Sequence, residues 1–410
     1  MDRETSVLFR SITAIFKTFG LLPFTITVPS TSKKGIDISP SRGTVAYNVL
    51  FFAAVLYANC FAGIPIIIRH AKSKLQDTQV ILDILHTIMA SGISLMTLAM
   101  FNARRAKMMN MTRDFLEVDR CIKRHRHIQS LKFSPRPLTV FIILYIIMWI
   151  VLVSTEWHED FVAAPKMQWL LWGFTYLVPV VIITLCVLQY GVIMKLVAFR
   201  FKLLNHTIRK STDTIAHCLN QNETFILPES AGDRVIVHKF RSIKSAHESL
   251  YDFTIAVSHF YSFLILPIIG FFCGTFIFLS FDFMMNAMSS KNEGNTISNY
   301  VAWILIVITP MVILLSNIEA ATEEYERTPI ELYKLASRFE SCRELATEVE
   351  LFSHDFLHKK MKLSALGCFP LDYTVFHSIL SATLTYLIII FQFQESRRMA
   401  SKKPANLTST

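Results

Sequence analysis

The chain has 410 residues, of which 52% are hydrophobic and only 18% charged, with 33 Phe but 12 Gly. This composition excludes an ordinary water-soluble domain and predicts an all-helical membrane protein with several spans. The net charge of +10 could suit nucleic acid, but Lys and Arg concentrate in alternate loops, which is typical of membrane orientation, so we expect no nucleic-acid partner.

The N-terminal segment, residues 1–43, is predicted to be cytoplasmic. Within it, apolar residues of Val7–Phe24 recur at helical spacing beside Arg10 and Lys17. This pattern predicts a short amphipathic helix that lies on the membrane surface. Its apolar face consists of Ile12, Ile15, Phe16, Phe19 and Leu22. Ser30–Arg42, rich in Ser, Lys, Gly and Pro, is predicted to be a linker.

Seven apolar segments follow, and each reaches or approaches the roughly 20 residues that a helix needs to cross a bilayer. They are Thr44–Ile68, Gln79–Ala103, Leu138–Thr155, Met167–Val197, Ile255–Met285, Ser298–Ile318 and Tyr373–Gln394. The first six make up a predicted transmembrane region, residues 44–318. The fourth and fifth are long enough to project from the membrane. We expect the fourth to continue through Phe199, Leu203 and Ile208, and the fifth to begin near Val235.

Basic residues give the orientation. The loops Arg104–Arg136, Phe199–Thr254 and Glu319–Asp372 hold 25 Lys and Arg, whereas the three alternate loops hold five. The positive-inside rule therefore predicts a cytoplasmic N-terminus and a short extracellular tail, residues 395–410. A G-protein-coupled receptor, one alternative seven-span class, has its N-terminus outside. The triplet that begins at Asp119 resembles a motif of that class, but it lies in a basic loop and is interpreted as solvated charge.

Residues 319–372 are charged yet periodic, which predicts cytosolic anchor helices. Their apolar face would pack on the extensions of spans four and five or on neighbouring subunits. It consists of Ile330, Leu332, Leu335, Phe339, Leu345, Val349, Phe352, Phe356 and Leu357. A group of acidic residues just inside span six has two interpretations, a solvated helix end or a cation-attracting portal. The group is Glu319, Glu323, Glu324 and Glu326.

The last span, residues 373–394, carries a small or polar stripe that includes Ser378, Ser381, Thr385 and Gln392 at helical spacings. Burying an amide in hydrocarbon without a hydrogen-bond partner costs about 4 to 8 kcal/mol, so this stripe should not face lipid. Two interpretations remain open: Gln392 lies near the membrane interface, or copies of the helix surround a pore.

Thr385 and Tyr386, five hydrophobic residues, then Gln392 and Phe393 resemble the C-terminal signature of insect gustatory receptors. The preceding run, Ala365–Asp372, is similar to that family's entry into its last helix. The resemblance implies a homotetrameric, ligand-gated, nonselective cation channel that passes Na, K and Ca in the plasma membrane of chemosensory neurons. Its partners would be identical subunits, the lipid bilayer and a small-molecule tastant, with a bitter or broadly tuned ligand favoured over a sugar such as fructose. An odorant receptor of the same architecture is the alternative.

In such a pore, Gln392 and Phe393 would form the constriction and Ile388 or Ile389 the apolar gate. Thr385 and Tyr386 would supply the packing and hydrogen bonds that hold the helix.

A ligand pocket is predicted in the outer half of the bundle, where the topology gathers polar and aromatic residues. An interfacial aromatic belt is the alternative explanation for these residues. The set is Asp83, His86, Trp149, Glu156, Trp172, Tyr176, Phe278, Asp282, Tyr300 and Trp303.

No enzyme signature is present, since His158-Glu159-Asp160 and His247-Glu248 do not complete HExxH and neither GxGxxG nor a P-loop occurs. We therefore expect no catalytic residues and no cofactor. His354 and His358 stand four residues apart, but a third ligand is not identified, so no metal site is expected.

Overall fold

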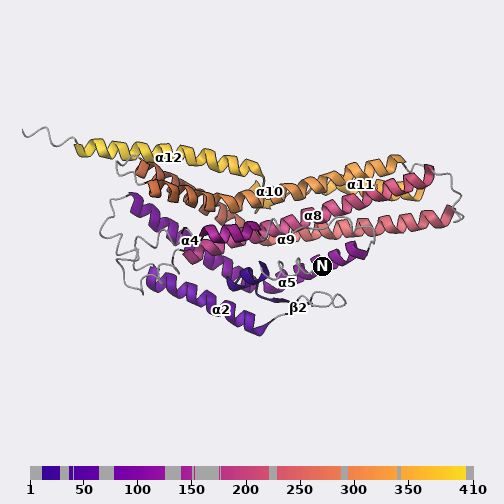
Figure 1. Cartoon of the computed structure of the whole chain (residues 1–410), viewed down its shortest axis with the longest axis horizontal. Coiled ribbons are helices and arrows are strands. Elements are labelled where there is room, and N and C mark those ends of the chain that lie inside the picture. Colours follow the sequence, from indigo (N-terminus) through magenta and orange to yellow (C-terminus); the bar gives the residue numbers. More distant parts are fainter. Residues whose placement is uncertain are drawn as a thin grey trace, which may run out of the picture.

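The computed structural model of the chain describes residues 12–27, 37–39, 41–63, 78–124, 140–149, 152, 175, 177–220, 229–287, 294–338 and 343–402. Helices dominate this part of the chain (Figure 1). They are α2 (Arg42–Tyr57), the π-helical η1 (Ala58–Gly63), α4 (Thr78–Ala103), α5 (Arg105–Arg124), α8 (Val178–Asn220), α9 (Glu229–Ala287), α10 (Gly294–Arg338), α11 (Arg343–His358) and α12 (Tyr373–Lys402). The strands are β1 (Thr25–Thr27), β2 (Asp37–Ser39), β3 (Ser364–Ala365) and β4 (Phe369–Pro370).

Six helices in the described residues are long and apolar enough to cross a membrane. They coincide with six of the seven predicted spans, in α2, α4, α8, α9, α10 and α12. A shorter apolar helix, Val140–Trp149, lies within the predicted third span. The predicted all-helical membrane fold is confirmed.

Three helices are much longer than a bilayer requires. α8 has 43 residues, α9 has 59 and α10 has 45. At 1.5 Å per residue these helices are roughly 65, 88 and 68 Å long, against a hydrocarbon core of roughly 30 Å. The predicted continuation of span four is confirmed, since Leu203 and Ile208 are buried in α8.

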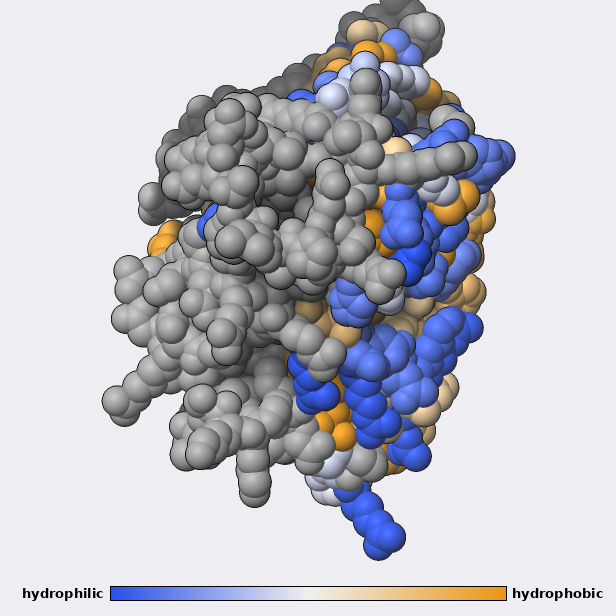
Figure 2. All heavy atoms as spheres, turned by 90° about the vertical axis from the view of Figure 1, so that its right-hand side faces the viewer, coloured by the Kyte–Doolittle hydropathy of each residue, from blue (hydrophilic) through white to orange (hydrophobic). Residues whose placement is uncertain are grey.

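The extra length of these helices forms one end of the molecule, which we call the polar end. It consists of residues 199–220 of α8, 229–254 of α9, 319–338 of α10 and the whole of α11. Figure 1 shows these helices continuing to the right beyond α2 and α12. Seen from that side, hydrophilic residues gather on the described surface, with apolar ones between them (Figure 2).

The apolar face predicted for the anchor helices packs at the polar end as expected in most positions. Leu332, Leu335, Leu345 and Val349 are buried. Ile330 is the exception among the described side chains, with 56% of its surface exposed; Phe339 and the side chain of Leu357 lie outside them.

Aromatic residues fill the centre of the bundle, where α8 meets α9 and α4. The rings of Tyr190 and Tyr261 stack with centroids 4.7 Å apart and planes within 4°. Phe101 meets Phe260 edge to face at 5.5 Å. Because all four side chains are fully buried, this cluster fixes the relative position of three helices.

The N-terminal helix, residues 12–18, packs its predicted apolar face on the bundle. Ile12 and Phe16 are buried in the same core as the spans. Side chains of two other helices form hydrogen bonds with the backbone that follows this helix. The Asn48 amide donates to the Gly20 carbonyl at 3.2 Å, and the Gln189 amide donates to the Leu21 carbonyl at 3.1 Å. These bonds satisfy two carbonyl groups of the turn that follows the helix.

The predicted linker contains regular structure, because β1 and β2 form an antiparallel pair in which Ile26 lies opposite Ile38.

The interpretation of Asp119 as solvated charge is wrong. Asp119 lies on α5, is only 8% exposed and forms an ion pair with Arg200 on α8. Its partner lies far away in the sequence, so the local basic surroundings gave no indication of it. A carboxylate at this depth is stabilised only as long as the guanidinium faces it.

Replacing Asp119 with Asn should therefore destabilise the protein, because it leaves the Arg200 charge buried without a counter-ion. The expected loss is about 3 to 5 kcal/mol, seen as a lower melting temperature of the detergent-solubilised protein by size-exclusion chromatography. The exposed neighbour Arg120→Gln should leave the melting temperature unchanged. The double variant Asp119→Leu/Arg200→Met should recover much of the loss; equal melting temperatures for Asp119→Asn and Arg120→Gln would contradict the pairing argument.

Candidate functional site

The last helix begins directly after a tight hairpin. Strands β3 and β4 are joined by a turn in which Leu366 has φ 51° and Gly367 has φ 75°, a conformation that glycine adopts without strain. Asp372 then caps the helix, because its Oδ1 accepts a hydrogen bond from the Thr374 N–H at 2.9 Å. The hairpin and cap together fix where α12 starts and the direction in which it leaves.

α12 is the least buried of the candidate spans. Only 11% of the residues in its most apolar stretch are buried within the chain, against 72% in α8. Val375 and Thr383 are buried, and α12 packs chiefly on α9. Figure 1 shows α12 along the edge of the bundle. Most of its surface is thus left for something other than this chain to cover.

The residues predicted for the pore and gate all lie on the exposed part of α12. They are Thr385, Tyr386, Ile388, Ile389, Gln392 and Phe393. Phe393 is 69% exposed, whereas Phe391, two residues earlier, is half-buried. The Thr385 hydroxyl donates to the Ser381 carbonyl of its own helix at 3.1 Å. The exposed stripe therefore combines an amide, a hydroxyl and bulky apolar groups.

Two members of the predicted ligand pocket meet between α4 and α9. The His86 ring stacks on Phe278 with centroids 5.8 Å apart, and on Phe271 with centroids 5.0 Å apart. His86 is 7% exposed. Phe271 is missing from the predicted set, although it lies seven residues, or two helical turns, before Phe278 on the same face.

A second pair joins the short helix Val140–Trp149 to α10. Trp149 and Trp303 meet edge to face, with centroids 5.3 Å apart and planes at 90°. Close by, the Tyr145 hydroxyl donates to the Ile306 carbonyl at 3.2 Å. Both tryptophans are buried, so they pack helices together and do not lie in an exposed interfacial aromatic belt.

The remaining predicted pocket residues are less informative. Asp282 on α9 and Tyr300 on α10 are half-buried. Glu156, Trp172 and Tyr176 lie outside the described residues, and the side chain of Asp83 is likewise outside them.

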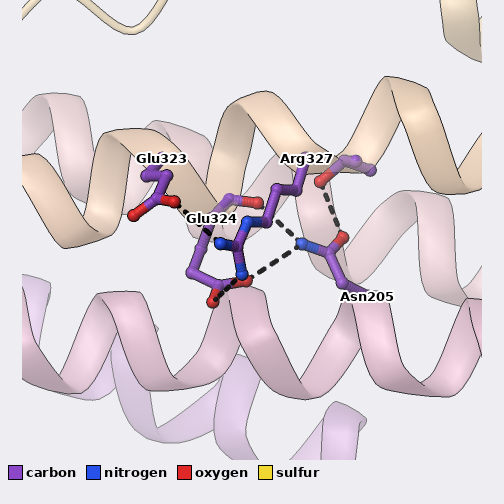
Figure 3. A network of polar contacts seen from close by, with 5 residues as sticks. Asn205, Glu323, Glu324 and Arg327 are labelled. Atoms are coloured by element: carbon purple, nitrogen blue, oxygen red, sulfur yellow. Dashed lines mark hydrogen bonds and ion pairs between the residues drawn. The ribbon is translucent and has the colours of Figure 1, made fainter.

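Two of the acidic residues inside span six form part of a polar network (Figure 3). Arg327 contacts Glu323 at 2.7 Å and Glu324 at 3.2 Å on the same helix, α10. From α8, the Asn205 amide donates to the Glu324 backbone carbonyl at 2.7 Å and accepts from the Thr328 hydroxyl at 2.8 Å. Arg327 offsets half of the charge of these two carboxylates, which weakens the case for a cation portal.

Aromatic and charged side chains line a small open pocket at the polar end. His247 of α9 stacks on Tyr325 of α10 at 5.4 Å and meets Phe352 and Phe356 of α11 at 5.3 and 5.2 Å. The Tyr325 hydroxyl donates to the Lys359 carbonyl at 2.6 Å, directly after α11. The cluster therefore connects α9 and α10 to the segment that leads into α12.

His354 and His358 lie with ring centroids 4.7 Å apart on the exposed face of α11. Within the described ranges, no three His, Cys, Asp or Glu side chains are grouped in a way that could hold a metal ion.

A bundle of apolar spans, a helical polar end and a thinly packed last helix define a helical membrane protein of several spans. The family described as 7tm Chemosensory receptor matches residues 9–397, and the chain belongs to it. Members of that family are chemosensory receptors and not enzymes.

Comparisons with individual proteins agree with this family assignment. The Drosophila melanogaster protein "Putative gustatory receptor 28b" is 20% identical over 239 residues, which cover 54% of this chain and 50% of that protein. The match thus spans about half the length of that relative. The structure of the insect olfactory receptor OR5 from Machilis hrabei has a TM-score of 0.58 at 11% identity, covering 95% of this chain and 99% of the receptor. The same receptor in complex with eugenol matches equally well, and both likenesses concern the fold.

Replacing Tyr325 with Phe should test the connection between α10 and the segment before α12, because it removes one buried hydroxyl and keeps the ring. The expected loss of stability is about 0.5 to 1.5 kcal/mol, measured as a lower melting temperature of the purified protein. Tyr333→Phe on the same helix is the matched control, since Tyr333 is 75% exposed. Equal melting temperatures for the two variants would show that the Tyr325 hydroxyl contributes nothing.

Proposed function

We propose that the chain is a gustatory receptor that acts as a homotetrameric, tastant-gated, nonselective cation channel, with α12 of each subunit lining the pore. The observation that carries the proposal is the exposure of α12. An apolar span that presents the Gln392 amide away from its own bundle requires a polar surrounding, and a water-filled pore supplies one. Four copies around an axis would also cover the exposed apolar residues of α12.

A taste receptor is favoured over an odorant receptor by the sequence. The Thr385-to-Phe393 signature and the Drosophila relative both support the gustatory branch. The likeness to an olfactory receptor is a likeness of fold and supports neither branch. We favour a bitter or broadly tuned ligand over a sugar such as fructose, and a receptor in the plasma membrane of chemosensory neurons.

Gating in this proposal is a rotation of α12. Gln392 and Phe393 are neighbours in sequence and about 100° apart around the helix, so only one of them can point fully along the pore axis. Four phenyl rings would exclude water and stop ions, whereas four amides would hydrate a cation. A small rotation of each helix would exchange one ring of side chains for the other.

The ligand would act from the outer half of the bundle, where α4, α9 and α10 hold His86, Phe278 and Trp303. Aromatic faces there suit apolar surfaces of a small molecule, and polar neighbours such as Asp282 suit its hydroxyl or amine groups. Binding opens the channel only through a higher affinity for the open arrangement than for the closed one.

Phe393→Ala should give current without agonist, because a methyl group cannot close the constriction. Phe391→Ala is the matched control, since Phe391 is half-buried on another side of the same helix. Whole-cell recording of both variants without ligand, with surface expression measured in parallel, decides the point. A silent Phe393→Ala channel that reaches the surface and still responds to agonist would remove Phe393 from the gate.

Phe278→Leu should raise the agonist concentration for half-maximal response by about two- to tenfold while leaving maximal current unchanged. The estimate corresponds to the loss of an aromatic contact. Phe263→Leu is the control, because Phe263 lies on the same helix and is 45% exposed. Calcium imaging against alkaloids, sugars and amino acids identifies an agonist first. A fall in maximal current without a shift would assign Phe278 to packing alone.

A further inference from the structure

An apolar groove separates the last helix from the bundle. It is open to the surface and lies between α9, α10 and the first turns of α12. Every side chain that lines it is apolar: Phe272, Phe276, Val307, Ile308, Met311, Phe376, Ile379 and Leu380. All eight residues fall within candidate membrane spans and outside the polar end, which is where an acyl chain could reach the groove from the bilayer.

A basic segment leads into the same helix. Between α11 and β3, Met361 and Leu363 are buried, whereas Lys360 and Lys362, which alternate with them, are exposed. This alternation is that of an extended chain with one side packed on protein and the other turned outward. No ion pair joins either lysine to another residue of the described ranges.

The hairpin brings these lysines to the start of α12. The Leu371 N–H donates to the Leu363 carbonyl at 2.9 Å, and Ser364 lies opposite Pro370. Continuing this register by two residues sets Lys362 opposite Asp372, the cap of α12. Asp372 is the one carboxylate of the segment 359–372, against Lys359, Lys360 and Lys362.

We propose that the groove and the basic segment together bind one anionic phospholipid. Its headgroup lies against Lys360 and Lys362, and one acyl chain fills the groove between α12 and the α9–α10 pair. The two parts fit in depth, because Phe376 and Leu380 lie roughly 6 and 12 Å further along the helix than Asp372. The first carbons of an acyl chain lie at a similar distance below their headgroup.

Charge and surface chemistry favour a lipid over a tastant. The apolar groove wall has no hydrogen-bonding group for a polar tastant. The lysines have no counter-charge to bind on an uncharged tastant. Anionic lipids are enriched in the cytoplasmic leaflet, where basic residues beside a span attract them. The start of α12 meets this leaflet in the orientation that the basic loops predict.

Photolabelling of the full chain tests the proposal. The protein is reconstituted in phosphatidylcholine nanodiscs that contain a trace of phosphatidylserine, or of phosphatidylcholine, with a diazirine in the acyl chain. Mass spectrometry then maps the labelled residues. The expected result is labelling of the groove residues several-fold above that of exposed Leu305 and Leu384, with phosphatidylserine preferred over phosphatidylcholine. Lys360→Gln/Lys362→Gln should reduce that preference at least about fivefold.

Filling the groove separates specific binding from the surrounding lipid. Ile379→Trp should lower labelling of the groove several-fold, whereas Leu305→Trp, at an exposed position of α10, should not. Comparable labelling of groove and exposed residues in the unaltered protein would overturn the site, and equal labelling by the two lipids would overturn the role of the lysines. Both of these outcomes are read without any substitution, so they do not depend on a variant folding.

Discussion

The long contact between α8 and α10 is the interaction on which the rest of the structure depends, since these two helices pack more extensively than any other pair of described helices. In the apolar part the backbones come close. A Cβ added at Gly191 would lie 3.5 Å from the Cα of Leu314. At the polar end the contact between the two helices becomes polar. Asn205 is hydrogen-bonded there to the Glu324 carbonyl and to the Thr328 hydroxyl. The same pair of helices is thus held by packing where it is apolar and by hydrogen bonds where it is polar.

The other elements attach to this pair in a defined order. α9 joins it through the stacked tyrosines in the centre and through His247 at the polar end. α11 then packs on α9 and α10 through its phenylalanines, and Tyr325 bonds the chain where α11 ends. Because Lys359 lies 14 residues before Tyr373, a movement of α10 at this point would reach the hairpin that starts α12. In the proposed channel this is a short physical route from the bundle to the pore helix.

Patterns that repeat along one helix could be predicted, and contacts between distant helices could not. Helical spacing gave the spans, the extension of α8 and most of the buried face of α11. Spacing alone misplaced Ile330, which lies on the predicted apolar face yet is exposed, because α10 turns that position away from its neighbours. Asp119 looked solvated since Arg200 is remote in sequence, and Phe271 was missed because its partner, His86, lies on another helix. For the N-terminal helix, amphipathic spacing identified the apolar face but did not distinguish a membrane surface from a protein surface.

The exposure of α12 has a further physical consequence. Lipid could cover Ile388, Ile389 and Phe393 at little cost, so these residues alone would not require a partner. Gln392 is different, because an amide in hydrocarbon lacks a partner and costs about 4 to 8 kcal/mol. Since a hydrogen bond from another amide or from water removes most of that cost, Gln392 favours arrangements in which copies of α12 face one another across water. The apolar residues beside it then set how tightly such a ring closes, and this is why one helix needs both kinds of side chain on its exposed face.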